Sequence, residues 1–143
     1  MITSFRGEYR FLSNFWLSPI TYGELRYMTV EHAYQAAKTV IPAEREYVRV
    51  APTPASAKRR GHAVTRRTDW DWYAVRIFIM EELLRLKFSD PLLRARLLAT
   101  REAELIEGNA WGDRFWGCVP HAGGWVGDNH LGRLLMKIRE ELR

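Results

Sequence analysis

Residues 69–88, DWDWYAVRIFIMEELLRLKF, decide the fold class. Their apolar side chains recur at intervals of three and four residues, at Trp72, Val75, Ile79, Leu83 and Leu86. Residues spaced in this way lie on one face of an α-helix and form an apolar stripe that packs against a core. Asp69 stands where an N-cap belongs. The stretch therefore predicts a long amphipathic helix that ends near Phe88.

Cap and breaker residues indicate further helices on both sides of this stretch. Thr29 and the pair Thr53-Pro54 are typical N-terminal signals, and Asp90 precedes a proline in the same way. Short helices are expected at residues 30–38, 43–51, 54–61, 91–98 and 131–142. Nearer the N-terminus, Gly23-Glu24 separates two runs rich in β-formers and predicts a hairpin. The pattern as a whole predicts a mainly α fold with a small N-terminal β element.

The chain has the length and composition of one soluble domain. Its 143 residues are 47% hydrophobic and 27% charged, which is close to globular averages and excludes disordered and fibrous classes. No apolar run approaches the ~20 residues that span a bilayer. Met1 is followed by no apolar signal region, and Cys118 is the sole cysteine. We expect a compact single domain over residues 1–143, in the reducing cytoplasm and not in a membrane.

Positive charge is concentrated in one short segment. The chain has 22 basic and 17 acidic residues, a net charge of +5. This excess equals five cations that no acid interrupts: Lys58, Arg59, Arg60, Arg66 and Arg67. The cluster predicts a surface for phosphate or nucleic acid, with a plain solvated face as the alternative. Histidine and cysteine do not occur at metal-ligand spacings and no glycine-rich nucleotide fingerprint is present, so neither a metal nor a cofactor is expected.

Three polar residues share one face of the helix expected after Thr29. Glu31, Gln35 and Lys38 are spaced at i, i+4 and i+7, so a helix aligns them along one side. An acid near the N-terminus and a lysine near the C-terminus also suit the helix dipole on an exposed face. The spacing alone is compatible with a site and with a solvated face.

The segment 108–128 is rich in glycine and holds three of the six tryptophans. A long loop of this composition is typical of binding loops. Within it Asp113 lies near tryptophans, and apolar surroundings raise the pKa of a carboxyl group so that it can act as acid or base. The alternative is that Asp113 caps a turn and Trp116 packs in the core.

Two more side chains have both a structural and a functional interpretation. Trp70, between two aspartates, either packs inward at a helix start or stacks on a planar ligand. Asn129 either caps the last helix or turns its amide to a ligand at the helix N-terminus.

The ordered set of motifs resembles the NADAR (YbiA-like) family over nearly the whole chain. The matching pieces are Ser13-Asn14-Phe15, Glu31-His32-(x)2-Gln35-Ala36-(x)1-Lys38, Lys58-(x)2-Gly61, Trp70, Lys87-Phe88, Leu97-Leu98-(x)1-Thr100, Glu107, Asp113-(x)2-Trp116-Gly117 and Gly127-(x)1-Asn129-(x)1-Leu131-Gly132-(x)2-Leu135-Met136. Each piece is weak alone, whereas their order is specific. The chain departs from the family pattern at Cys118-Val119-Pro120-His121, at His130 and at His62. These departures surround the expected phosphate and base contacts and bear on the substrate more than on the bond type.

The resemblance implies a compact multihelical fold and hydrolysis of N-glycosidic bonds of ribose-phosphate compounds. Two substrate classes follow from it, ADP-ribose N-linked to guanine in nucleic acid and phosphoribosylamino-pyrimidine intermediates of riboflavin synthesis. The basic run favours the nucleic acid, and an ADP-ribosyltransferase toxin would then be the cognate partner. A non-catalytic module that binds ADP-ribose or NAD is the alternative outside enzymes.

The site residues follow by motif position. Cleavage of an N-riboside develops positive charge at the anomeric carbon, so the site needs an anion and a base. Glu31 and Asp113 are the expected pair, and Lys38 either contacts a phosphate or hydroxyl or attacks an opened sugar as a Schiff base. The expected substrate-binding residues are Asn14, Phe15, Gln35, Trp70, Trp116 and Asn129, and the expected phosphate or nucleic-acid contacts are Lys58, Arg59, Arg60, Arg66 and Arg67.

Overall fold

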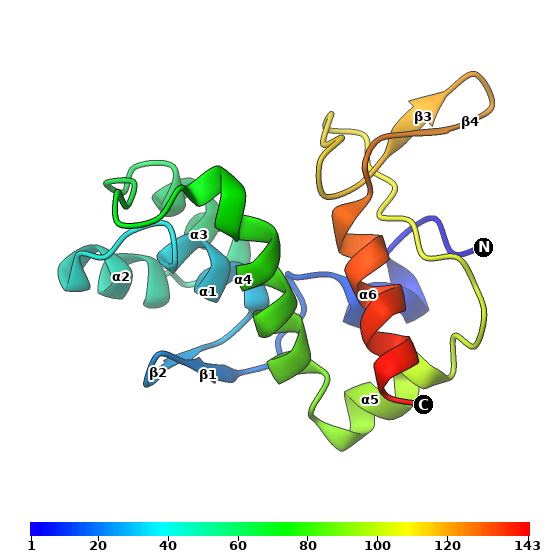
Figure 1. Ribbon diagram of the computed structural model, residues 1–143, viewed down its shortest axis with the longest axis horizontal. Helices are drawn as coiled ribbons and strands as arrows, with labels where there is room; N and C mark the ends of the chain where they lie inside the picture. Colours follow the sequence, from blue (N-terminus) through cyan, green and yellow to red (C-terminus); the bar gives the residue numbers. More distant parts are fainter. The chain divides into compact units, whose positions relative to one another are not determined.

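The computed structural model describes all residues, Met1–Arg143, and Figure 1 shows its helices and strands. Contacts within the chain divide it into two compact units. Unit 1 joins Met1–Ser13 to Phe88–Arg143, and unit 2 is Asn14–Lys87. The single domain over residues 1–143 stays a prediction. The chain forms seven helical segments and two two-stranded sheets, which confirms the mainly α class.

Unit 2 begins with the expected hairpin. Strand β1 (Ile20–Tyr22) pairs antiparallel with β2 (Leu25–Tyr27). Gly23 and Glu24 between them have φ angles of 56° and 69°, the left-handed conformation that a two-residue hairpin turn requires. The Tyr22 hydroxyl donates to Glu82 Oε2 at 2.7 Å and ties the hairpin to the longest helix.

Three short helices follow in unit 2. They are α1 (Val30–Ala36), α2 (Pro42–Arg49) and α3 (Pro54–Gly61). The Thr29 hydroxyl oxygen accepts the N–H of His32 at the start of α1, and Thr53 forms a capping box with Ser56 at the start of α3. Both N-caps are therefore where the sequence predicts them, since capping depends only on nearby residues.

Helix α4 (Trp72–Lys87) completes unit 2 and carries the predicted apolar stripe. Trp72, Ile79 and Leu83 are buried, and the Trp72 ring lies 5.3 Å from that of Tyr34 on α1. The expected start of this helix at Asp69 is wrong. The Asp69 carboxylate binds Arg67 instead, and Asp71 accepts the N–H of Tyr73 in the first turn.

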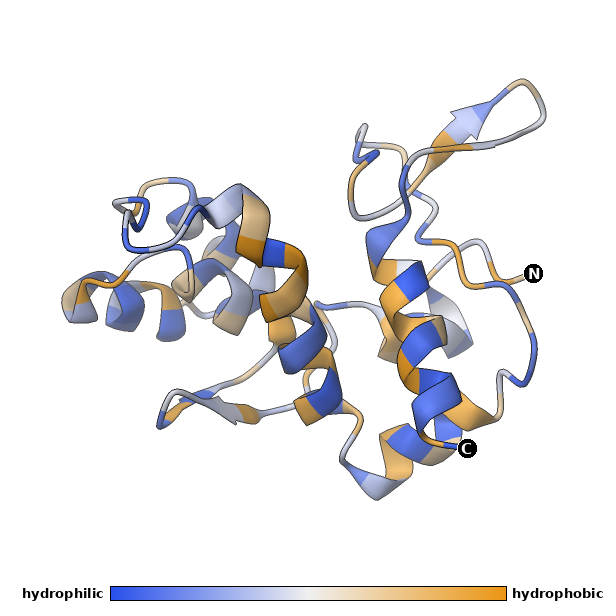
Figure 2. Ribbon diagram, viewed as in Figure 1, coloured by the Kyte–Doolittle hydropathy of each residue, from blue (hydrophilic) through white to orange (hydrophobic).

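Unit 1 contains the remaining elements. They are the 3-10 helix η1 (Gly7–Leu12), α5 (Pro91–Leu98), β3 (Val119–His121), β4 (Gly124–Val126) and α6 (His130–Glu141). The Asp90 carboxylate accepts the N–H of Leu93 and caps α5 as predicted. Figure 2 shows hydrophobic and hydrophilic residues alternating around α6. Its buried face includes Leu131, Leu135 and Ile138.

The β3–β4 hairpin lies inside the segment that we expected to be a loop. Its strands pair antiparallel, with Pro120 opposite Trp125. Ala122 and Gly123 make the turn with φ angles of 49° and 79°. A second β element therefore accompanies the N-terminal one. In the whole chain no helix is long and apolar enough to cross a bilayer.

Candidate active site

The polar row on α1 is buried. Glu31 is 8% exposed, Gln35 3%, and Lys38, directly after the helix, 8%. The interpretation of this row as a solvated helix face is therefore wrong. Burial of a carboxylate, an amide and an ammonium together is costly unless they bind one another or a ligand, so this face of α1 is the first candidate for a site.

Glu31 is oriented by its neighbours on and before the helix. Its Oε1 accepts a hydrogen bond from Gln35 Nε2 at 2.8 Å, and its backbone N–H donates to the Asn14 carbonyl at 3.1 Å. The Gln35 amide packs directly against Gly61 of α3, which has no side chain. A Cβ at position 61 would stand only 2.0 Å from Gln35 Oε1, so a side chain there displaces the amide.

The Lys38 ammonium lies among other cations. Its pKa is lowered to about 8, chiefly by burial; Glu31 opposes the shift, and the positive charges of Arg66, Lys58 and Arg76 add to it. Three basic side chains from a helix, a loop and α4 thus act on one buried lysine. This concentration of positive charge beside a carboxylate suits a phosphorylated ligand.

The structure divides the predicted basic run. Lys58 and Arg66 stand close enough to Lys38 to lower its pKa, whereas Arg59 is exposed. Arg60 donates to the Tyr47 carbonyl at 2.8 Å and lies over the Tyr47 ring. The five cations are therefore not one surface.

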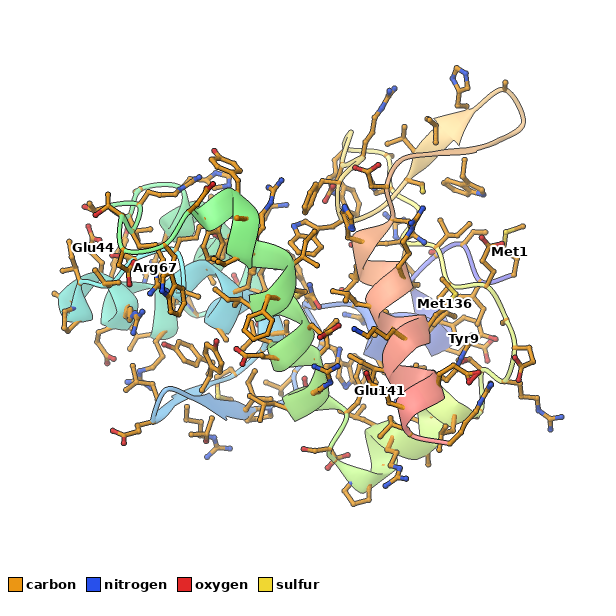
Figure 3. The ribbon with its side chains drawn as sticks, viewed as in Figure 1. Met1, Tyr9, Glu44, Arg67, Met136 and Glu141 are labelled. Carbon is orange, nitrogen blue, oxygen red and sulfur yellow. The ribbon has the colours of Figure 1, made fainter.

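Arg67 has a structural role in the same segment, and Figure 3 labels it. Its guanidinium forms an ion pair with Asp69 at 2.8 Å and donates to the Ala37 carbonyl at 3.2 Å. The same guanidinium stands 4.0 Å from the ring centre of Trp70, which is 50% exposed. Trp70 is thus a surface ring that is held in place and not a core residue.

Asn14 is buried with an almost unused side chain. Its Oδ1 has no hydrogen-bond partner, and its Nδ2 donates only to Met80 Sδ at 3.5 Å. A buried amide without strong partners is destabilising by about 1–3 kcal/mol and is typical of positions that meet a ligand. Its neighbour Phe15 is 43% exposed. The structure places Asn14 next to Glu31 through the backbone hydrogen bond described above.

His32 fixes the start of α1. Its Nε2 lies 3.0 Å from the Ala51 carbonyl, which can only accept, so this nitrogen carries the proton. Its Nδ1 then accepts the hydroxyl of Thr29 at 2.7 Å. Both ring nitrogens thus have partners, and the start of the helix that bears Glu31 is tied to Ala51, which follows α2.

In unit 1, Asp113 caps a turn. Its Oδ1 accepts the backbone N–H groups of Phe115 at 3.0 Å and Trp116 at 2.9 Å. Asn109 holds the same turn, because its Oδ1 accepts the Asp113 N–H and its Nδ2 donates to the Asp113 carbonyl. The structural alternative for Asp113 is thus realised, and its catalytic role stays a prediction. Trp116 is half-buried and packs edge-on against Phe115.

Asn129 occupies the N-cap position of α6, but its side chain does not cap the helix, so that expectation is wrong. Its Oδ1 accepts the N–H of Glu107 at 3.1 Å, and its Nδ2 donates to the Leu105 carbonyl at 2.9 Å. The first N–H groups of α6 find carbonyls instead. Those of His130 and Leu131 donate to residues 115 and 116. A role of Asn129 in substrate binding stays a prediction.

Sequence reasoning missed two basic residues. Arg76 is not among the predicted site residues, yet its charge acts on Lys38. Lys87 is 1% exposed, and burial lowers its pKa to about 7. The available signal was position, because Lys87 follows Leu83 by four residues and so falls on the buried stripe. The protein has no group of three or more His, Cys, Asp or Glu side chains placed to hold a metal.

Comparison with known proteins assigns these features to a family. The NADAR domain matches residues 4–143. N-glycosidase YbiA of Escherichia coli (strain K12) is 37% identical over 136 residues, which are 94% of this chain and 82% of that protein. Riboflavin biosynthesis protein VVA0006 of Vibrio vulnificus is 37% identical over 134 residues, 93% of this chain and 35% of that one. The NMR structure of E. coli YbiA superposes with a TM-score of 0.82 at 36% identity, over 99% of this chain and 84% of that one.

Proposed function

The chain belongs to the NADAR family, and we propose that it is an N-glycosidase that releases ADP-ribose from guanine bases of nucleic acid. It is a hydrolase of N-glycosyl compounds, like the relative of 37% identity named N-glycosidase. Guanine in nucleic acid is the finer part of the proposal. An ADP-ribosyltransferase that modifies guanine would supply this substrate.

The observation that carries the proposal is the buried Glu31 carboxylate beside the Lys38 ammonium. As the N-glycosidic bond breaks, positive charge grows at the anomeric carbon. A carboxylate fixed by Gln35 can stabilise this charge or take a proton from the attacking water. The surrounding cations, Lys58 and Arg66 among them, balance phosphate charge on the same ligand.

Lys38 has two chemical options in this scheme. As an ammonium it binds a phosphate or hydroxyl oxygen, and as a neutral amine it attacks an opened sugar to form a Schiff base. Its pKa of about 8 leaves most of the side chain charged at pH 7. We therefore propose the ammonium role.

The remaining predicted site residues have roles that their surroundings support to different degrees. The unsatisfied amide of Asn14 supports a direct contact with substrate, and the exposed rings of Phe15 and Trp70 support stacking on base or ribose. Asp113, in unit 1, remains our prediction for the second carboxylate. Trp116 and Asn129 remain predicted contacts from the family resemblance.

The test is release of ADP-ribose from a guanine-modified oligonucleotide, followed by mass. We expect free ADP-ribose and an intact strand from the wild-type protein. Glu31→Gln should lower the rate by about 10²- to 10⁴-fold, the range for loss of a general base. Glu24→Gln, in the exposed hairpin turn, is the matched control and should keep the wild-type rate. Equal rates for both variants would remove Glu31 from the mechanism.

A second candidate substrate is a phosphoribosylamino-pyrimidine. The similarity to a riboflavin biosynthesis protein favours it, and one phosphate monoester would also suit the cations around Lys38. The salt dependence of turnover distinguishes the two substrates. Turnover of an oligonucleotide that is held through several phosphates falls steeply between 50 and 200 mM salt, on the order of 10-fold or more. A flat response, together with turnover of the pyrimidine compound, would favour the small substrate.

A further inference from the structure

Arginine side chains lie over two exposed aromatic rings beside the candidate site. The Arg67 guanidinium is 4.0 Å from the Trp70 ring centre, and those of Arg66 and Arg76 are 5.2 and 5.1 Å from the centre of the Tyr73 ring. Tyr73 is 64% exposed and Trp70 50%. Two exposed rings, each with a guanidinium group over it, thus lie at the start of α4, and Arg66 is the exposed cation among the three.

The same arginines lead to the buried site. Arg66 and Arg76, which lie over Tyr73, are two of the three cations whose charge acts on Lys38. A ligand that touches Tyr73 therefore lies one arginine away from Lys38. Arg66 and Arg76 thus connect the exposed Tyr73 ring to the surroundings of the buried lysine within unit 2.

The two arginines of the loop before α4 have different charge environments. Arg67 is neutralised by Asp69, so its main effect is to fix the Trp70 ring. No carboxylate pairs with Arg66, which is exposed, so its charge is available to an anion. A preformed ring next to a free cation is the arrangement that binds an unpaired base together with its phosphate.

We infer that Trp70, Tyr73, Arg66 and Arg76 form a platform for single-stranded nucleic acid that flanks the base under attack. This inference rests on the proposed function, since it states where the nucleotides on either side of the reacting guanine bind. Unpaired bases stack on aromatic rings and on guanidinium planes, whereas bases within a duplex expose only their edges. Every base has such a face, so the platform binds without sequence preference.

The chain contains its own control. Arg60 lies 4.6 Å from the ring centre of Tyr47, which is 48% exposed, so the same pair of side chains occurs on α2 and α3. There the guanidinium donates to the Tyr47 carbonyl, and its charge is not among those that act on Lys38. We expect a strand on the platform to leave this second pair untouched.

The experiment measures affinity for an unmodified, fluorescein-labelled 12-nucleotide DNA by anisotropy at ~50 mM salt. We expect Tyr73→Ser and Arg66→Ala each to weaken binding by about fivefold to tenfold. Tyr47→Ser and Arg60→Ala should change it by less than about twofold. All four side chains lie at the surface, and a thermal melt of each variant checks that it is folded.

Three results would overturn the platform: equal losses in both pairs, no loss in the first pair, or tighter binding of the duplex of the same sequence. Because unmodified DNA is not turned over, the result is independent of the proposed reaction. If the platform variants weaken binding while ADP-ribosyl guanine stays intact, the platform stands and the reaction does not. If ADP-ribose is released but variants of both pairs change DNA affinity equally, the reaction stands and the platform does not.

Discussion

The face of α1 and the loop that contains Asp113 differ in how their buried polar atoms are used. In the loop, Asn109 bonds at both ends of its amide, to the N–H and the carbonyl of Asp113. Around α1, Asn14 Oδ1 and Gln35 Oε1 have no hydrogen-bond partner, although both residues are buried. A satisfied network stabilises a fold, whereas buried polar atoms without partners need another explanation, of which a bound ligand is one. The contrast supports our proposal that the first region binds the ligand and that the second supports the fold.

The largest expected difference between the two regions is in how a substitution changes the free energy of unfolding. Asn109→Leu leaves the Asp113 N–H and carbonyl without partners, and we expect it to lower the free energy of unfolding by about 2–4 kcal/mol. Asn14→Leu removes an amide that has only a sulfur contact, so it should change stability by less than about 1 kcal/mol or raise it. Urea denaturation of both variants measures this. Equal losses of stability in the two variants would contradict the proposed difference between the two regions.

Asp113→Asn sharpens the assignment of the loop. An asparagine keeps an Oδ1 that can accept the N–H groups of Phe115 and Trp116, so the turn and the melting temperature should be preserved. If the carboxylate also acts in catalysis, as we propose, turnover falls by about 10²-fold. Wild-type turnover in a folded Asp113→Asn protein would confine Asp113 to its turn. Asp113→Ala loses both the accepting oxygen and the charge, so its loss of stability measures the contribution of the cap.

Local signals made most of the fold predictable, because they depend on neighbouring residues alone. The caps at Thr29, Thr53 and Asp90 and the turn at Gly23 are of this kind. The start of α4 was wrong because Asp69 finds an ion-pair partner in Arg67, which a helix-capping rule does not weigh. The β3–β4 hairpin was missed because glycine-rich aromatic sequence is compatible with loop and hairpin alike.

The sequence predicts which residues are candidates for the site, but it does not predict their surroundings. Spacing places Glu31, Gln35 and Lys38 on one face, and only packing decides that this face is buried. The basic run predicts one surface, yet tertiary partners turn Arg60 to the Tyr47 carbonyl. Long-range partners are absent from any spacing rule, and for the same reason Arg76 was missed.

Gly61→Ala tests the orientation of Glu31 through Gln35. A methyl group at position 61 would stand 2.0 Å from Gln35 Oε1 and must displace the amide that donates to Glu31. We expect turnover to fall by about tenfold, since misplacement of a catalytic group by about 1 Å has effects of this order or more. Gly124→Ala is the control, because its nearest neighbour is 3.8 Å away. Unchanged turnover in Gly61→Ala would mean that Gln35 does not position the carboxylate.

A further prediction concerns the pH dependence of stability that Lys38 imparts. Its pKa is lowered to about 8 in the folded protein from an ordinary 10.5. Between these values the unfolded chain binds more protons than the native one, so stability rises with pH across this window. The penalty for charging the buried ammonium is fully present below pH 8. Lys38→Met should therefore be more stable than wild type at pH 7, with the difference shrinking toward pH 10 in urea melts.

Turnover over the same range distinguishes the two roles of Lys38. If the ammonium binds the substrate, as we propose, kcat/KM falls about twofold between pH 7 and pH 8 and further above it, because the charged fraction declines. If the neutral amine attacks the sugar, the rate rises over this range instead. Borohydride would then trap a covalent adduct in the wild type and not in Lys38→Met. A falling profile without an adduct makes Lys38 a binding group and leaves Glu31 as the residue of α1 that acts on the bond.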